Sequence, residues 1–304
     1  MGDLAVVVLA HTDARHVGRL VSALGDLPVF LHCDAKTASS EYELMRRMGR
    51  RVAMLPRRDT RASSWSLVAA ELSGLEAAVR TTTADHIALL SGADYPLSSV
   101  DGLLEALAPW DGHSYLYNRR LPFPQWSGGG EWRMRHRFLT RNDNVLTICR
   151  RPIRSPFRRR LPDGLELRAS SQWKVYAREH AELLLRVVED RPDLLRFWRT
   201  SFVPDESFAA SVLSSRALVG SSAVPLCLAN PWYYRFPAGG HHPRWLGTSD
   251  LPDLSLASRA EPMSPTEAFG ATGDPVRKHQ KLFARKFTST DAEVVDRIDV
   301  DLRR

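Results

Sequence analysis

The first 55 residues alternate short apolar runs with segments of helical periodicity, and this alternation restricts the fold more than any other feature of the sequence. Leu4–Ala10 (LAVVVLA) is apolar throughout, as in a strand of a parallel sheet that is covered on both faces. Two more apolar runs follow at 29–33 and 52–55, with one helical segment in each interval. The order of strand, helix, strand, helix, strand predicts an α/β fold with a Rossmann-like, nucleotide-binding sheet.

The middle of the chain, 119–169, lacks the periodicity seen before it. Up to that point we predict a helix over 64–80, with Trp65 and Leu72 on its apolar face, and a strand over 86–90. From 119 to 169, glycine, proline and arginine replace the regular pattern. Long irregular segments in ordered domains are usually functional. We therefore expect an irregular basic loop here.

Regular periodicity returns at residue 172 and continues through a predicted helix over 203–213. Pro204 suits the first position of that helix. A chain of 304 residues lies near the upper limit for one hydrophobic core. We therefore predict a single domain over 1–304, whose halves 1–118 and 170–304 flank the irregular segment.

The net charge of +7 indicates an anionic partner. A good part of it comes from six arginines in one short stretch: Arg150, Arg151, Arg154, Arg158, Arg159 and Arg160. Nucleic acid, an acidic membrane face or a phosphorylated substrate would each suit such a stretch, as would a solvated loop without a partner. Composition alone leaves all four open.

Neither the cysteines nor the apolar runs indicate a secreted or membrane-spanning protein. Cys33, Cys149 and Cys227 are an odd number and lack the spacing of a metal site. No run of about 18 consecutive apolar residues occurs, and Leu4–Ala10 is too short and lacks the basic flank of a signal peptide. We therefore predict a cytoplasmic protein without a disulfide framework.

Polar residues follow three of the predicted strands at the point where each strand ends. They are His11, Thr12 and Asp13 after the first, Asp34, Ala35 and Lys36 after the second, and Ser91, Gly92, Ala93 and Asp94 after the fourth. In an open α/β sheet, ligands bind at the carboxyl ends of the strands. These ends predict a nucleotide site, and the absence of a P-loop or a GxGxxG motif disfavours an NTPase or a dehydrogenase.

Six runs of sequence, taken in order, resemble one enzyme family. They are VVVLAHTDARHVGRLVSAL, VFLHCDAKT, SSWSLVAAELSGLEAAV, ALLSGADYPL, FVPDESF and LFARKF. Their order and spacing resemble the core-2/I-branching β-1,6-N-acetylglucosaminyltransferase family, glycosyltransferase family 14, which also holds protein O-xylosyltransferases. The resemblance covers 4–107 and, more loosely, 170–287, and leaves the irregular segment largely unmatched.

This resemblance implies a GT-A-type fold, inversion at the anomeric carbon and no divalent metal. The implied donor is UDP-N-acetylglucosamine, with UDP-xylose as the alternative. No DxD motif follows a central strand. Asp299 and Asp301 have that spacing, but at the end of the chain we expect them in a solvated tail.

The resemblance assigns catalysis to Glu206, which matches the glutamate of the family's PDE motif. One general base is needed to take the proton from an attacking hydroxyl, and a helix N-terminus would keep Glu206 ionised. Without the resemblance, Asp205 and Glu206 could simply favour the helix dipole. Arg285 and Lys286 match the family's basic element and would stabilise the departing UDP. Otherwise they could be surface charges.

The resemblance and the strand ends together give the predicted binding residues. Those for the donor are His11, Asp34, Lys36, Ser64, Trp65, Gly92, Asp94, Arg285 and Lys286. Those for the acceptor are Glu131, Arg135, Arg137, Trp232 and Tyr234, of which the two aromatic rings could stack on a sugar. Trp65 would also fit an ordinary core.

The acceptor itself stays open between a glycan and a small molecule. The absence of a membrane anchor and of many cysteines puts Golgi-type acceptors in doubt. A basic nucleic-acid-binding protein is an alternative, but no helix-turn-helix, RRM or zinc pattern accompanies the charge. An inactive sugar-binding module is a third hypothesis, and the presence of Glu206 with two candidate cations disfavours it.

Overall fold

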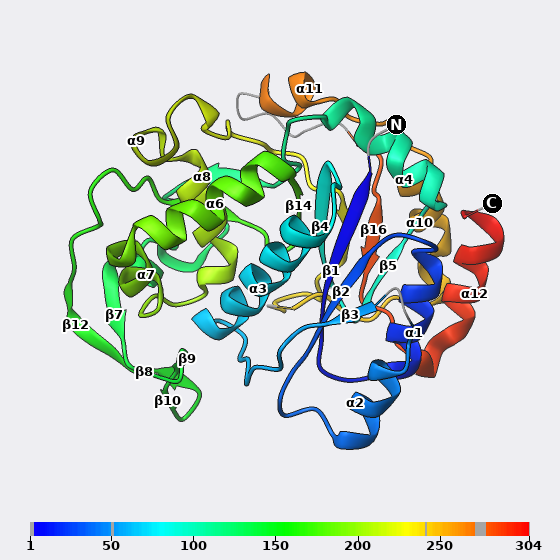
Figure 1. The fold of residues 1–304 in the computed structure, drawn as a ribbon, viewed down its shortest axis with the longest axis horizontal. Helices are drawn as coiled ribbons and strands as arrows, with labels where there is room; N and C mark the ends of the chain where they lie inside the picture. Colours follow the sequence, from blue (N-terminus) through cyan, green and yellow to red (C-terminus); the bar gives the residue numbers. More distant parts are fainter. Residues whose placement is uncertain (1–2, 50–51, 241, 271–277, 304) are drawn as a thin grey trace.

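The structure, a computed structural model, describes residues 3–49, 52–240, 242–270 and 278–303. Its centre is a five-stranded sheet in the order β14-β4-β1-β2-β3 (Figure 1). The strands are β1 (Leu4–Ala10), β2 (Val29–Cys33), β3 (Val52–Met54), β4 (His86–Ser91) and β14 (Lys174–Ala177). The first four are parallel, and β14 runs antiparallel along β4. The predicted α/β class with a Rossmann-like sheet is confirmed.

Helices on either side bury the central strands. The helices of this half are α1 (Ala14–Ala23), α2 (Ser39–Arg46), α3 (Trp65–Thr81) and α4 (Val100–Leu107). Every residue of β1 is buried, as its apolar sequence predicts. Helix α3 packs closely on β1, because a Cβ atom at Gly74 would lie 2.3 Å from a methyl carbon of Val7. Glycine is therefore required there.

A second, three-stranded sheet brings the end of the chain to the central sheet. Its order is β15-β16-β5, from β15 (Trp232–Tyr233), β16 (Phe283–Arg285) and β5 (Asp94–Pro96). Helices α10 (Leu251–Ser258) and α12 (Ala292–Asp301) lie on the same side of the molecule (Figure 1). We expected a solvated tail at Asp299, but this residue contacts the N-terminal part of the chain. Its carboxylate accepts hydrogen bonds from Arg19 (2.7 Å) and Tyr95 (2.8 Å).

The segment 119–169, expected to be an irregular loop, is built largely of short antiparallel pairs. They are β6 (Asn118–Arg120) with β13 (Arg168–Ser170), β7 (His136–Phe138) with β12 (Arg154–Arg158), β8 (Thr140–Arg141) with β9 (Asn144–Val145), and β10 (Thr147–Ile148) with β11 (Arg151–Pro152). Apart from β12, which has five residues, these strands have two or three residues and are too short for their alternation to show in the sequence.

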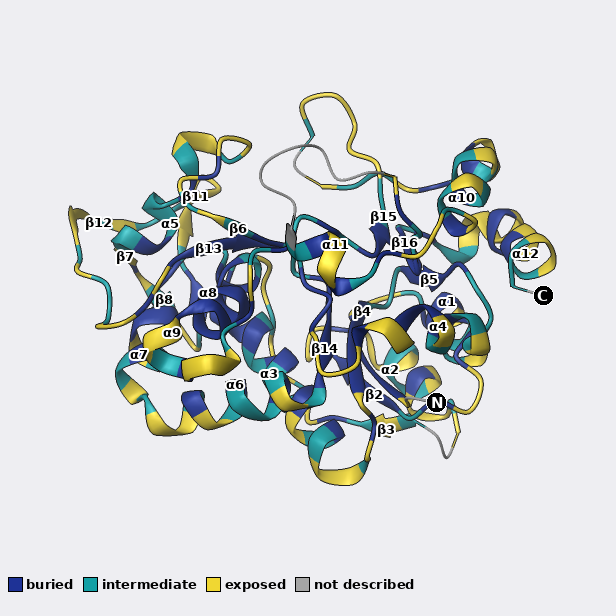
Figure 2. Cartoon of the chain, turned by 90° about the horizontal axis from the view of Figure 1, so that it is seen from above, coloured by how far each residue is buried: buried dark blue, intermediate teal, exposed yellow. Residues whose placement is uncertain are grey.

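The remaining helices lie in the later part of the chain. They are α5 (Trp132–Arg135), α6 (Arg178–Asp190), α7 (Pro192–Trp198), α8 (Phe208–Ser214), α9 (Arg216–Val219) and α11 (Pro265–Gly270). Of them, α6 packs on β4 and β14 of the central sheet. Single 3-10 turns lie at 108–110, 127–129, 204–206, 220–222, 248–250 and 289–291. One buried core cluster includes residues from β1 to α12. Figure 2 shows buried segments at both ends of the molecule. Within the described ranges, no helix is long and apolar enough to cross a membrane.

Candidate functional site

A cleft of about 590 Å³ opens at the carboxyl ends of β1, β2 and β4. Six predicted donor-binding residues line it: His11, Asp34, Lys36, Gly92, Arg285 and Lys286. The volume is in the range of pockets that hold small ligands and cofactors. The cleft also lies where open α/β sheets bind their ligands. The residues at the ends of separate strands therefore meet at one place.

Gly92 lets the chain pass close to the floor of this cleft. Its backbone N–H donates to the carbonyl of Leu9 at 2.9 Å. A Cβ atom at this position would lie 3.0 Å from side-chain carbons of both Ala10 and Val17. A larger residue would push the loop after β4 away from β1 and narrow the cleft.

Asp34 lies at the cleft wall with most of its hydrogen-bonding capacity in use. Its carboxylate accepts from the backbone N–H (2.7 Å) and Nζ (3.1 Å) of Lys36, and from the N–H and hydroxyl of Thr60. Burial would raise the pKa of Asp34, but the hydrogen bonds from Thr60 and Lys36 lower it below its usual value. A ligand at this wall would meet Lys36 and Thr60 as well.

Asp94 and Trp232 are not available to ligands, so two of the predictions are wrong. The carboxylate of Asp94 is fully buried and accepts from Ser91 (2.7 and 2.9 Å) and from the indole N–H of Trp232 (3.2 Å). The Trp232 ring is buried against Phe283, with ring centroids 5.0 Å apart. Pairing of β16 with β5 also places Arg285 Nε 3.3 Å from Asp94. Asp94 therefore positions Arg285.

Arg285 and Lys286 bring two adjacent positive charges to the cleft. The Arg285 guanidinium stacks over Trp173 at 4.0 Å from the ring centroid. Lys286 Nζ lies 5.8 Å from the centroid of Trp245. Burial lowers the pKa of both groups, and for Lys286 the neighbouring Arg285 charge lowers it further. Because the buried Asp94 carboxylate offsets only part of this charge, the pair forms a partly desolvated site suited to an anion.

Glu206 does not lie at a helix start, which corrects the predicted helix over 203–213. Residues 204–206 form a 3-10 turn, and α8 begins only at Phe208. Before this turn, Val203 has a φ of 52° and donates its N–H to Ser63 at 3.0 Å. A positive φ costs a β-branched residue about 1–3 kcal/mol, and such strain is frequent at functional sites.

The carboxylate of Glu206 is held by an arginine that the sequence prediction missed. Arg133 Nη1 donates to Glu206 Oε2 at 2.8 Å, and its guanidinium stacks over Trp126 at 3.9 Å. The predicted neighbour Arg135 instead lies 3.9 Å from Glu131. Residues two apart on a helical turn point about 200° apart. Arg133 therefore faces Glu206, whereas Arg135 faces away.

The remaining acceptor predictions have mixed outcomes. Arg137 is exposed on β7, and no described ion pair includes it. Tyr234 is half-buried near the site: burial raises the pKa of its hydroxyl, the negative charge of Glu206 raises it further, and Arg285 lowers it. Its hydroxyl accepts a hydrogen bond from the Asn230 side-chain amide at 3.2 Å. Glu206 itself does not line the cleft.

Ser64 and Trp65 are buried behind the site, so the prediction that they contact the donor is wrong. The Ser64 hydroxyl accepts from the N–H of Val145 at 3.0 Å. Trp65 packs its edge on Phe208, with ring centroids 5.0 Å apart. Ser64 therefore joins the start of α3 to the segment 119–169, and Trp65 joins it to α8, which follows the turn that carries Glu206.

A buried charged network, also missed, supports the same turn. Lys174 Nζ lies 3.2 Å from Glu71 Oε1 and 3.4 Å from the carbonyl of Asp205. Tyr176 donates its hydroxyl to the same Glu71 oxygen, and all three side chains are at least 97% buried. Isolated Lys and Glu residues in a sequence give no sign that they will pair inside a core.

We expect Lys174→Met to lower the free energy of unfolding by about 3–5 kcal/mol, because it leaves the Glu71 carboxylate buried without a cation. Urea denaturation measures this change. The double variant Lys174→Met/Glu71→Gln removes the unpaired charge and should recover part of the loss. A single variant within about 1 kcal/mol of the native protein would contradict the network's role.

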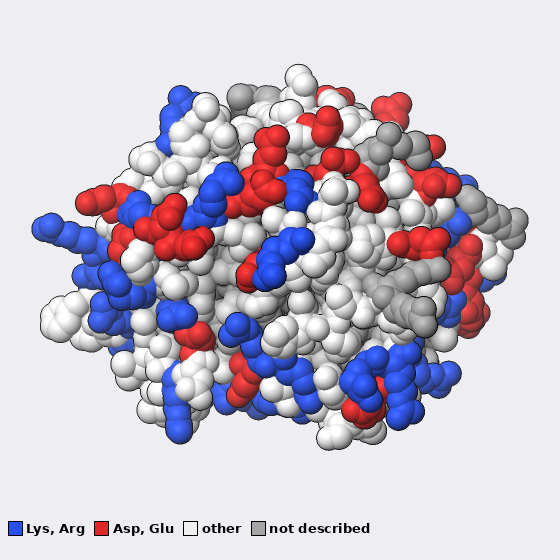
Figure 3. All heavy atoms as spheres, viewed as in Figure 1, with Lys and Arg blue, Asp and Glu red and all other residues white. Residues whose placement is uncertain are grey.

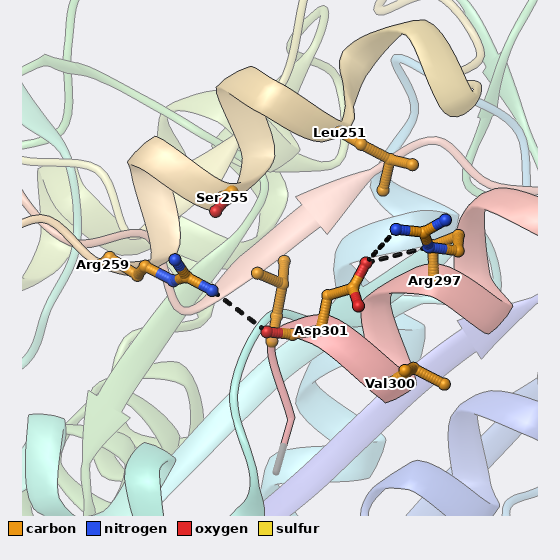
Figure 4. Close-up of a pocket in the computed structure, with 7 residues that line it drawn as sticks. Leu251, Ser255, Arg259, Arg297, Val300 and Asp301 are labelled. Atoms are coloured by element: carbon orange, nitrogen blue, oxygen red, sulfur yellow. Dashed lines mark hydrogen bonds and ion pairs between the residues drawn. The ribbon is translucent and has the colours of Figure 1, made fainter.

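A second cavity, of about 350 Å³, lies between α10 and α12 (Figure 4). Its charged groups bond one another: Arg297 donates to Asp301 at 2.9 Å, and Arg259 donates to the Asp301 carbonyl at 3.3 Å. None of the predicted site residues lines it. Across the described residues, no group of three or more His, Cys, Asp and Glu side chains is placed to hold a metal.

The fold and the cleft together define a class of protein. A cleft at the ends of parallel strands with two adjacent cations is typical of an enzyme that binds a phosphorylated nucleotide. The profile of the Core-2/I-Branching enzyme family matches residues 8–251. The chain therefore belongs to this family and is a glycosyltransferase, which confirms the predicted family. The matched span includes Glu206 and ends before Arg285.

Comparison with curated proteins gives no match, whereas 71 chains of solved structures match, among them two with low sequence identity. One is a structure described as a glucose-1-phosphate thymidylyltransferase from Bacillus anthracis, with 9% identity, 60% of this chain and 74% of that chain covered, and a TM-score of 0.29. Another is the bifunctional IspDF from Campylobacter jejuni, with 10% identity, 61% of this chain and 42% of that chain covered, and a TM-score of 0.28.

Proposed function

We propose that this glycosyltransferase moves N-acetylglucosamine from UDP-N-acetylglucosamine to a hydroxyl group of a glycan or small molecule, with inversion and without a divalent metal. UDP-xylose is the alternative donor. The observation that carries the proposal is the cleft formed by strand ends, which Arg285 and Lys286 line with two adjacent positive charges. Family membership supports the GT-A-type fold and the transfer of a sugar.

In the proposed reaction, the Glu206 carboxylate takes the proton from the acceptor hydroxyl. The hydroxyl oxygen forms a bond to the anomeric carbon from the face opposite the donor phosphate. The bond between that carbon and the diphosphate oxygen breaks at the same time, and UDP leaves with its electron pair. Arg285 and Lys286 stabilise the negative charge that develops on the diphosphate.

Arg133 and Tyr234 complete this arrangement. The 2.8 Å ion pair with Arg133 holds Glu206 in one orientation while leaving its side chain 37% exposed, so an acceptor hydroxyl can reach it. Tyr234 is assigned to stacking on the acceptor sugar; it is half-buried, and its hydroxyl accepts a hydrogen bond from the Asn230 side-chain amide at 3.2 Å.

Calorimetric titration with a panel of nucleotide sugars, each with and without EDTA, tests the proposal. We expect UDP-N-acetylglucosamine or UDP-xylose to bind in the low micromolar to millimolar range typical of such substrates, and chelation to leave binding and turnover unchanged. Binding of GDP- or TDP-sugars alone, or strict dependence of turnover on Mn²⁺ or Mg²⁺, would overturn it.

A further inference from the structure

The basic character of the chain belongs almost entirely to one segment. Residues 119–169 contain thirteen arginines, no lysine and four carboxylates. The rest of the chain contains twenty-nine Lys and Arg residues and thirty-one Asp and Glu residues. The proposed transferase chemistry uses only Arg133 from this segment. The remaining positive charge therefore calls for a separate explanation.

Most of this charge lies on the paired strands of residues 136–160, which we call the hairpin lobe. The lobe protrudes at the end of the molecule farthest from α12 (Figures 1 and 2), and Figure 3 shows Lys and Arg side chains along that edge. Seven of its arginines are exposed: Arg137, Arg141, Arg150, Arg151, Arg154, Arg158 and Arg160. Among the described residues, only Arg158 of these seven lies in an ion pair, 3.8 Å from Glu131.

The hairpin lobe also exposes large apolar side chains. Phe157 is 79% exposed, Ile148 65% and Leu139 51%. These are three of eight such side chains on the described surface, and Phe157 is the most exposed of them. Exposed apolar groups gathered among charges of one sign mark a contact surface. A surface that binds only phosphate groups would not require exposed apolar side chains such as Leu139 and Ile148.

Tight turns fix the tips of the hairpin lobe. Cys149 and Arg150 have φ values of 47° and 63°, and they join the paired residues Ile148 and Arg151. Two central residues with positive φ make the compact turn that suits a two-residue hairpin. The turn therefore presents Ile148, Arg150 and Arg151 together at its end.

The hairpin lobe is attached rigidly to the catalytic half. Phe138 donates its N–H to the carbonyl of Thr200 at 2.9 Å, and Phe202 donates to the carbonyl of Arg133 at 2.9 Å. The Arg159 side chain donates to the carbonyl of Phe197 at 3.0 Å. A partner held by the lobe would therefore keep a fixed position relative to Arg133 and its ion pair with Glu206.

We propose that the hairpin lobe docks this enzyme on an anionic lipid bilayer. The exposed arginines face the lipid phosphates, and Phe157 and Ile148 enter the boundary between headgroups and acyl chains. A bilayer matches both features, since it offers negative charge next to an apolar layer. This inference goes beyond the transfer reaction, and it places the acceptor side of the enzyme next to a membrane surface.

Sedimentation with lipid vesicles tests the proposal. We expect the native protein to bind vesicles containing one third phosphatidylglycerol, to bind pure phosphatidylcholine much more weakly, and to dissociate as salt is raised. The variant Arg150→Gln/Arg151→Gln/Arg154→Gln should bind about 10²-fold more weakly, from about fivefold for each arginine. Phe157→Ser should bind roughly tenfold more weakly.

Matched variants elsewhere on the surface act as controls. Arg46→Gln/Arg47→Gln on α2 and the residue after it, and Leu256→Ser on α10, change exposed residues of the same types and should bind like the native protein. Nucleotide-sugar binding, measured in parallel, checks folding and separates this inference from the proposed reaction. Equal binding to neutral and anionic vesicles, or unchanged binding of the arginine variant, would overturn the docking surface.

A fluorophore on Cys149 reports insertion directly. Cys149 is exposed, whereas Cys33 and Cys227 are buried, so a polarity-sensitive maleimide labels this hairpin tip selectively. Its emission should shift to shorter wavelength when anionic vesicles are added. Sedimentation without a shift would contradict insertion of this tip. Tight binding of duplex DNA at physiological salt that survives Phe157→Ser and blocks vesicle binding would instead assign the lobe to nucleic acid.

Discussion

Replacing Glu206 by glutamine is expected to lower kcat by about 10²- to 10⁴-fold, the usual contribution of a general base. The amide has nearly the size of the carboxylate, and its carbonyl oxygen can still accept the hydrogen bond from Arg133. It cannot take a proton from the acceptor. Donor affinity should therefore persist, because Glu206 lies outside the cleft that receives the nucleotide.

Asp205→Asn provides the matched control for this prediction. Burial and the negative charge of Glu206 raise the pKa of Asp205 above its usual value, and asparagine matches its protonated carboxyl in size and shape. We expect kcat to change much less than in Glu206→Gln. Kinetics with saturating UDP-sugar and calorimetric donor binding measure both variants. A folded Glu206→Gln protein that turns over at nearly the native rate would reject Glu206 as the base.

The sequence predicted the central sheet because each of its inner strands is a continuous apolar run. Leu4–Ala10 and 29–33 were found with their observed bounds. Such runs stand out since a parallel sheet buries both faces of its strands. The hairpins of 119–169 were missed for the opposite reason. Their strands have two to five residues and half-exposed faces, and tertiary contacts rather than local pattern define them.

The polar residues that follow the strands predicted where the cleft lies, but the sequence did not show which of their side chains point into it. Gly92 and Asp94 follow the same strand, yet Gly92 lines the cleft and Asp94 is fully buried. The difference arises from β16, which lies far from β5 in the sequence but pairs with it and encloses Asp94. The sequence shows that residue 94 is an aspartate, but only the strand order of the folded protein shows which residues surround it.

Strand β14 connects the two parts of the proposed chemistry. Trp173, directly before this strand, lies under the Arg285 guanidinium at the cleft. The next residue, Lys174, reaches the carbonyl of Asp205 inside the core. Successive residues of an extended chain point to opposite sides. Neighbouring residues of one edge strand therefore support the cation on one side and the turn that carries Glu206 on the other.

Replacing Lys286 by alanine is expected to lower kcat by roughly 10²-fold or more, as when a transition-state donor is removed elsewhere. Lys286 is the better target of the two cations. Arg285 is buried and pairs with Asp94, so its loss would also disturb the junction of β5 and β16. Lys286 is half-buried and lines the cleft, so its truncation should leave the fold intact.

Lys286→Arg and Lys278→Ala make this test specific to charge and position. Arginine keeps a cation at the departing diphosphate and should retain much of the activity, while Lys278 is exposed and its loss should have no effect on kcat. Lys286 is proposed to stabilise the negative charge that develops in the transition state. Lys286→Ala should therefore lower kcat more than it lowers the affinity for the donor. Turnover of Lys286→Ala close to native, with EDTA present, would show that this cation does not stabilise the leaving group.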